Sequence, residues 1–191
     1  SSIVKPVLDD LSARIKWRSG LAIPNGIHMN LRYLTSATTM ALEHWTAGST
    51  ISVPSSNGGV LYLAMSPPDV REILFERLKA YYSKKPQNYW DVLLSEALLA
   101  ERNRYAISRM NPKEHGIGVP IIVNGEFLGS VGIQYITRAV TQSKLLDEYL
   151  PLLHSAADDI SSAVGEELAQ SPPATREASS DWRPDRRAAC G

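Results

Sequence analysis

Cysteine is nearly absent from this 191-residue chain, because Cys190 is the only one and stands next to the last residue. A single cysteine cannot form a disulfide within the chain or build a thiolate metal site. Long apolar runs are also missing. Stretches such as residues 119–123 fall far short of the roughly 20 residues that cross a bilayer, and no charged and then apolar leader stands at the start. We therefore expect a cytoplasmic protein.

An excess of either charge is lacking as well, since 20 Lys and Arg side chains balance 20 Asp and Glu. A domain that binds nucleic acid unaided is usually basic, so direct DNA or RNA binding is not expected. Hydrophobic residues make up 43% of the chain, which is enough for a sizeable core. From residue 170 on, prolines, arginines and small residues replace any periodic pattern. This composition predicts one folded domain over residues 1–169 and a disordered tail over residues 170–191.

Apolar residues at helical spacing predict helices over residues 3–16, 89–104 and 141–168, with two more that start near residues 57 and 67. Strands are predicted over residues 21–23, 27–34, 105–108, 117–123 and 127–136, and Asn25-Gly26 favours a hairpin between the first two. Residues 35–53 are ambiguous and are expected to hold a short strand and a loop. This order predicts an α+β domain with a mainly antiparallel sheet and helices packed mostly on one face.

Familiar catalytic motifs are absent from the sequence. There is no G-x-S-x-G or H-E-x-x-H, and residues 57–59 (NGG) are not followed by the Lys-Ser or Lys-Thr of a phosphate loop. Residues 113–115 (KEH) suit half of an acid–base site or a polar loop, and we favour the loop. His154 and Asp158 lie four apart on a predicted helix, but no third metal ligand accompanies them. We predict no enzymatic activity, no metal and no cofactor.

Two features of the sequence could bind an anion. Arg109 follows a predicted strand, where an arginine is either a surface charge or the bidentate partner of a carboxylate beside a pocket. The helix start at Ser56, Asn57 and Gly58 presents free N–H groups and a partial positive charge, which suit an anionic ligand or an ordinary cap. Gly132 lies within a predicted strand, and glycine there often marks the close approach of a ligand or another backbone.

Three stretches together resemble the IclR-type transcription regulators. Residues 57–64 (NGGVLYLA) resemble the small-residue helix start of that family. Residues 117–133 are similar to its paired strands "IAAPV…G…GALSV", and residues 149–160 resemble its closing helix. The resemblance covers about residues 4–168. It implies a GAF-like domain that binds a small effector, self-association as a homodimer or homotetramer, and DNA binding only through a winged helix-turn-helix domain that this chain does not contain.

The chain departs from the family at two places. Residues 134–136 (QYI) stand where the family commonly has SGP, and Gly116 stands where it often has a cysteine, so the groups that bind small polar effectors such as glyoxylate are replaced. The QYITR run is similar to the subgroup that controls breakdown of aromatic acids, which favours an aromatic carboxylic acid. The alternatives are a free-standing GAF-like enzyme, which would need cysteines in its fold, and an oligomerisation module with an empty pocket.

These observations place the expected effector pocket between a sheet face and the helix start at residues 56–58. Gly132 and Gln134 share that face because side chains alternate along a strand, and the loop over residues 42–45 is expected to cover the ligand. His115 and Arg32 are the alternative anchors to Arg109. The expected effector-binding residues are Ser56, Asn57, Gly58, Arg109, His115, Gly132, Gln134, His44 and Trp45.

Overall fold

The computed structural model describes residues 3–36 and 45–171 of the chain. Two predictions therefore lie wholly or mostly outside the described residues: the position of His44 with most of its loop, and the tail from residue 172 on. None of the described helices is long and apolar enough to span a membrane.

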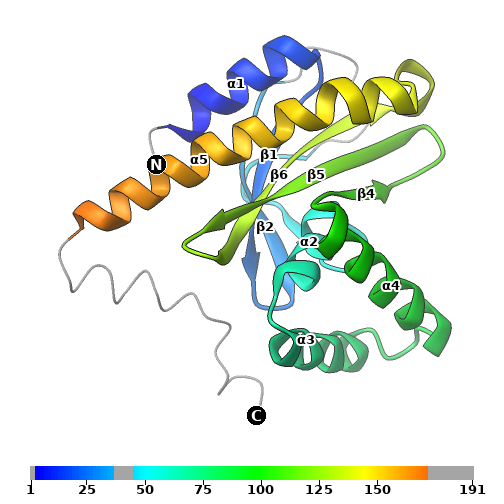
Figure 1. Cartoon of the computed structure of the whole chain (residues 1–191). Coiled ribbons are helices and arrows are strands. Elements are labelled where there is room, and N and C mark those ends of the chain that lie inside the picture. The colour runs from blue at the N-terminus through cyan, green and yellow to red at the C-terminus, as the bar shows by residue number, and fades with distance from the viewer. Residues whose placement is uncertain (1–2, 37–44, 172–191) are drawn as a thin grey trace.

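Six strands form one antiparallel sheet in the order β3-β2-β1-β6-β5-β4 (Figure 1). The long β5–β6 hairpin turns at Asn124 and Gly125, which both have positive φ, as a two-residue hairpin turn requires. The strands are β1 (Ser19–Asn25), β2 (His28–Leu34), β3 (Thr50–Ser52), β4 (Ala106–Arg109), β5 (Glu114–Val123) and β6 (Glu126–Ile136). The predicted α+β class and the antiparallel sheet are confirmed.

The helices also follow the predicted order. They are α1 (Val4–Ile15), α2 (Asn57–Met65), α3 (Pro68–Tyr81), α4 (Gln87–Asn103) and α5 (Leu150–Gln170). A short 3₁₀ turn (Thr137–Ala139) follows β6, and a π-helical segment (Lys144–Tyr149) leads into α5. Pro151, which has no N–H to donate, stands in the first turn of α5.

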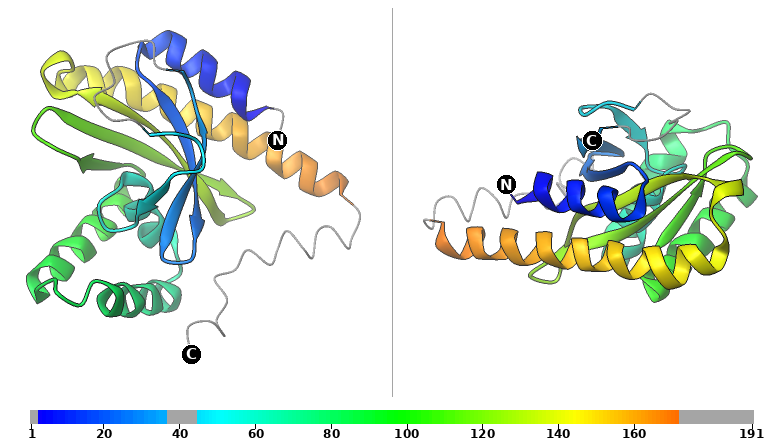
Figure 2. Two further views of the ribbon diagram at one scale, coloured as in Figure 1. Left: turned by 180° about the vertical axis from the view of Figure 1, so that it is seen from behind. Right: turned by 90° about the horizontal axis from the view of Figure 1, so that it is seen from above.

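The helices cover both faces of the sheet, which differs from the prediction of helices mostly on one face (Figures 1 and 2). On one face, α1 and α5 pack against the branched side chains of β5 and β6, such as Ile117, Val119 and Ile133. On the other, α2 lies on the same two strands and forms a second core with α3, α4, Met29 and Leu31. The prediction of one covered face failed because β5 and β6 present glycines to α2. Glycines have no apolar side chain, so the sequence does not show that this face is buried.

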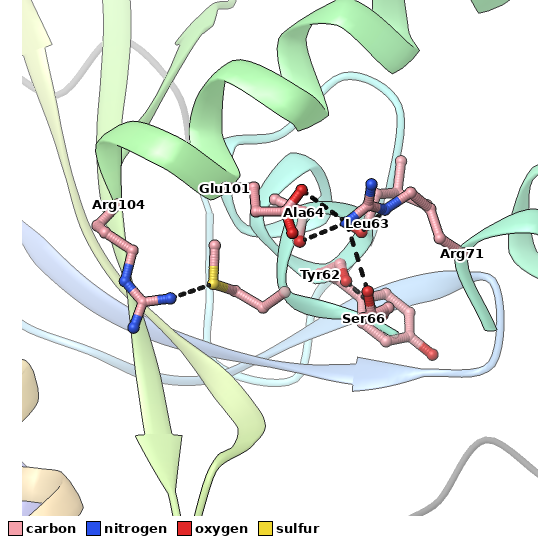
Figure 3. A network of polar contacts seen from close by, with 8 residues as sticks. Tyr62, Leu63, Ala64, Ser66, Arg71, Glu101 and Arg104 are labelled. Carbon is pink, nitrogen blue, oxygen red and sulfur yellow. Dashed lines mark hydrogen bonds and ion pairs between the residues drawn. The ribbon is translucent and has the colours of Figure 1, made fainter. Parts of the chain in front are cut away.

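Arg71 on α3 closes the carbonyl end of α2 (Figure 3). Its Nε donates to the Leu63 carbonyl at 2.8 Å, and its Nη2 donates to the Ala64 carbonyl at 2.8 Å. The same Nη2 lies 3.0 Å from Glu101 on α4. The Arg71 residue is only 8% exposed, so this one guanidinium satisfies orphan carbonyls of α2 and holds α2, α3 and α4 together.

Replacing Arg71 with Met should therefore destabilise the domain by about 3 kcal/mol, because buried carbonyl groups lose their donor. Chemical denaturation followed by circular dichroism measures this change. The matched variant Glu101→Gln should cost less than about 1 kcal/mol, since that side chain is 50% exposed and exposed ion pairs contribute little. Equal losses in the two variants would show that the carbonyl contacts are not the main contribution.

His154 on α5 predicts a pH dependence of stability. Burial lowers the pKa of His154 below its ordinary 6.5, and Arg104 adds to the effect against the opposing charge of Asp158. The folded state thus binds this proton less readily than the unfolded chain. The contribution of neutral His154 to stability is complete above about pH 6.5 and is lost as the pH falls towards the lower pKa of the folded state.

No cluster of three metal-ligating His, Cys, Asp or Glu residues occurs in the described part of the chain.

The melting temperature should therefore fall between about pH 7 and about pH 5, and the fall should be shallower in His154→Gln. Differential scanning calorimetry across this range measures the slope. His28→Gln, which changes a histidine that packs edge-on against Tyr81 at the other side of the molecule, is the control. An unchanged slope in His154→Gln would exclude His154 as the source.

Candidate functional site

A cavity of about 380 Å³ opens between the start of α2 and the sheet. This volume lies within the range of small-molecule sites. Its walls come from β1, β2, β3, β4, β6, the start of α2 and the segments next to them. The lining residues are Arg18, Gly20, Ala22, Met29, Leu31, Leu34, Trp45, Ile51, Ser52, Ser55, Ser56, Asn57, Gly58, Ser108, Arg109, Met110, Ser130, Gly132, Ile133 and Gln134.

The start of α2 lies directly on the sheet because glycines leave room for it. A Cβ on Gly116 would come within 2.8 Å of Asn57 Nδ2, and one on Gly132 within 3.2 Å of Asn57 Oδ1. A Cβ on Gly118 would overlap the same oxygen. The Asn57 side chain occupies this glycine-lined hollow and donates from Nδ2 to Ser108 Oγ at 3.1 Å. The three glycines thus position the floor of the cavity.

The first turn of α2 has free backbone N–H groups beside the cavity. Ser56 caps the helix by accepting from the Gly59 N–H at 3.1 Å and by donating to the Ser52 carbonyl at 2.7 Å. The cap does not bind the N–H groups of Asn57 and Gly58, and no acceptor for them is found among the described residues. Both residues line the cavity. Unbonded N–H groups at a helix start carry a partial positive charge that attracts an anion.

Arg18, which no pattern in the sequence marks, adds a positive charge to the cavity. Its backbone carbonyl accepts from the Gln134 N–H at 3.4 Å, which places Arg18 beside Gln134 at the head of β1. Its Nε donates to the Thr35 carbonyl at 2.7 Å, so the guanidinium is held in place. Burial lowers the pKa of Arg18 from its ordinary value. A partly desolvated cation of this kind is stabilised by a bound anion.

Arg109 and His115 lie differently from the expected anchors. Arg109 borders the cavity. In the sheet register it lies opposite His115 of β5, and His115 lies opposite Tyr135 of β6. The neighbouring Ser108 faces Asn57, so alternation directs Arg109 to the opposite face. On that face burial raises the pKa of the Tyr135 phenol, and the charge of Arg109 partly offsets this rise. His115 packs edge-on against Tyr135 on that face and does not line the cavity.

Seven of the nine expected residues therefore surround one cavity. Of the remaining two, His115 lies on the opposite face of the sheet, and His44 is outside the described residues. The seven are Ser56, Asn57, Gly58, Arg109, Gly132, Gln134 and Trp45.

The remaining walls of the cavity are apolar, and no carboxylate lines it within the described part of the chain. Trp45, Met29, Leu31 and Ile51 are among the apolar residues that line it. The indole Nε1 of Trp45 is buried and has no hydrogen-bond partner among the described residues. Buried donors rarely stay unpaired. The cavity thus offers positive charge and donors beside an apolar surface, an arrangement that suits an organic anion.

A double-mutant cycle can test the contact between α2 and the sheet. Gly118→Ala should destabilise the domain by about 1–3 kcal/mol, because the new methyl group overlaps Asn57. Asn57→Ala removes the overlapped amide, so the double variant should be less destabilised than the sum of the single changes. Urea denaturation of the four proteins measures this coupling, and strict additivity would mean that the two residues do not meet.

No family model matches the chain, but solved structures with the same fold exist. IclR of Thermotoga maritima superimposes with a TM-score of 0.76 at 22% identity, over 86% of this chain and 68% of that protein. An IclR-family regulator from Brucella abortus gives 0.73 at 20% identity, over 85% and 62%. An IclR homologue from Microbacterium hydrocarbonoxydans, solved with 4-hydroxybenzoate, gives 0.70 at 18%, over 84% and 66%.

The chain thus spans about two thirds of the length of these regulators. A crystal structure of only the C-terminal domain of a Vibrio cholerae regulator aligns over 94% of its length, with a TM-score of 0.70 and 18% identity. The matched part is therefore the C-terminal part of such a protein. The chain has the fold of the C-terminal domain of IclR-type transcription regulators, as the resemblance in its sequence implied.

Proposed function

We propose that this chain is the effector-sensing domain of an IclR-type regulator, that it binds an aromatic carboxylic acid in the cavity at the start of α2, and that it acts on an attached DNA-binding helix-turn-helix domain. The observation that carries the proposal is the electrostatic character of the cavity. Arg18 and the free N–H groups of α2 provide positive charge, while no carboxylate lines the cavity in the described residues. The transcription regulators among the similar structures support a role in regulation.

We assign the carboxylate of the effector to the part of the cavity that is lined by Arg18 and the start of α2. Nε of Arg18 is occupied by the Thr35 carbonyl, which leaves the two Nη groups to bind both oxygens of a carboxylate. The N–H groups of Asn57 and Gly58 add dipolar stabilisation from another element. Arg109, at the edge of the cavity, is a secondary contact that would attract an approaching anion rather than bind it.

The ring of the effector is assigned to the apolar side. Met29, Leu31, Trp45 and Ile51 provide an apolar and aromatic surface, and the Met sulfur and the indole both pack well on aromatic rings. A ring hydroxyl would supply the acceptor that Trp45 Nε1 lacks within the described residues. The 4-hydroxybenzoate bound to the Microbacterium hydrocarbonoxydans homologue is a compound of this class.

A buried group of hydroxyls provides a route from the cavity to α1. Thr35, whose carbonyl binds Arg18, contacts Ser12 of α1 through its hydroxyl at 2.9 Å. Ser12 Oγ also lies 2.7 Å from Ser19 Oγ, and Ser19 donates to the Leu8 carbonyl at 3.0 Å. An anion that reorients Arg18 would change the Thr35 contact and so act on α1. Effector binding would then favour one arrangement of α1 over another.

The proposal predicts that Arg18→Ala weakens binding of 4-hydroxybenzoate by about 1.5–3 kcal/mol, the range for a hydrogen bond to a charged group. Arg109→Ala should weaken binding by less than about 1 kcal/mol, as a solvent-exposed charge does. Isothermal titration calorimetry measures both.

Arg32→Ala, which removes an exposed arginine of β2 that does not line the cavity, is the matched control. Gly132→Leu should abolish binding by filling the cavity. Unchanged affinity in both Arg18→Ala and Gly132→Leu would contradict the site. If a panel of aromatic acids fails to bind the unmodified protein while aliphatic acids bind, the ring assignment is wrong and the anion site stands.

A further inference from the structure

One buried serine of the sheet has no hydrogen-bonding partner within the described residues. Ser130 on β6 is only 3% exposed, and its neighbours across the sheet are Ala22 of β1 and Pro120 of β5. Neither neighbour has a polar side chain, and the Ser130 hydroxyl forms no hydrogen bond with another part of the described chain. Buried polar side chains are nearly always paired, so this hydroxyl is expected to find its partner outside the chain.

The Ser130 hydroxyl borders the cavity next to the first turn of α2. Ser130 belongs to the lining of the cavity, on the same sheet face as Gly132 because side chains alternate along β6. A Cβ on Gly58 would come within 2.6 Å of Ser130 Oγ and 3.4 Å of Met29 Cε. The hydroxyl therefore lies near a glycine without a side chain and an apolar methionine. Because none of these neighbours offers a polar side chain, a ligand group in the cavity is free to bind it.

Ser130 lies apart from the charge of Arg18. Gln134, which is beside Arg18, stands four residues from Ser130 along β6, a separation of roughly 13 Å between the backbone positions. A carboxylate bound by the Nη groups of Arg18 therefore leaves Ser130 for another part of the same ligand. Met29, one of the residues to which the ring is assigned, lies close to the same point as Ser130. The hydroxyl is thus placed beside the ring rather than beside the carboxylate.

We infer that Ser130 determines specificity: its hydroxyl binds a polar substituent that the effector carries on its ring. The inference rests on the proposed function and deepens it, because it separates hydroxylated aromatic acids from plain ones. A phenolic hydroxyl both donates and accepts, so it can pair with Ser130 in either direction. A site built to hydrogen-bond such a group rejects an analogue that lacks it, since the polar group of the site is then left unpaired.

The first test measures stability without a ligand. An unpaired buried hydroxyl does not stabilise the fold, so Ser130→Ala should leave the melting temperature unchanged or raise it by about 2 °C. Ser108→Ala is the matched control, because it removes a buried hydroxyl that accepts from Asn57 Nδ2 at 3.1 Å, and it should lower the melting temperature by about 3 °C. Differential scanning calorimetry measures both. An equal fall in the two variants would show that the Ser130 hydroxyl has a structural role and would overturn the inference.

The second test measures selectivity by isothermal titration calorimetry with benzoate, 3-hydroxybenzoate and 4-hydroxybenzoate. Ser130→Ala should weaken the hydroxybenzoate that the unmodified chain prefers by about tenfold, the effect of one hydrogen bond, and should change the affinity for benzoate by less than about twofold. Arg18→Ala should instead weaken all three acids alike, because they share the carboxylate. Equal losses for benzoate and the hydroxybenzoates in Ser130→Ala, or no loss for any of them, contradict the inference alone. If the unmodified chain binds none of the three acids, the proposed function fails and the inference fails with it.

A thiol probe tests access to Ser130 without any effector. In a Cys190→Ser background, the thiol of Ser130→Cys should react with a small methanethiosulfonate reagent, because the cavity leads to it. The thiol of Ser66→Cys should react at least tenfold more slowly, since Ser66 is similarly buried but does not line the cavity. Circular dichroism verifies that both variants are folded. Equally slow reaction of the two thiols would mean that no ligand reaches Ser130, which overturns the inference and leaves the proposed function intact.

Discussion

The close contact between the start of α2 and the sheet is the constraint on which the rest of the structure depends. Asn57 reaches into a hollow that exists only because Gly116, Gly118 and Gly132 have no side chains. A helix normally packs on a sheet at the distance that two layers of side chains require. Here the backbone of α2 comes closer, and the first turn of the helix lines a cavity. The same approach gives the sheet a second buried face and the protein a second core.

Holding a helix end at such a position requires that its other end be held as well. Nine residues form α2, too few for a helix that is stable alone. Ser56 caps its start, and Arg71 binds carbonyls at its end. Each contact satisfies backbone groups that would otherwise be buried without partners. The floor of the cavity is therefore held at both ends of α2.

The sequence predicted the strands and helices well because their signals are local. The β5–β6 hairpin follows from alternation and from the turn at Asn124-Gly125, and the start of α2 follows from its capping residue. The role of Arg18 could not be predicted, because an arginine at the head of a strand resembles a surface charge until Gln134, far along the chain, is placed beside it. His115 was misplaced for a related reason. Side chains alternate along β5, so His115 points to the face opposite to the one that Gly116 presents to Asn57. Glycines give no hydrophobic pattern in the sequence, so the sequence does not show which face borders the cavity.

The cavity and the helices α3 and α4 belong to one packed unit. α2 contributes its first turn to the cavity and packs along its length against α4, while Arg71 joins the two helices through Glu101. A ligand at the start of α2 therefore contacts a body that includes α3 and α4. If the chain is the proposed sensor, a ligand bound beside Arg18 can act on α1 through Thr35 and Ser12.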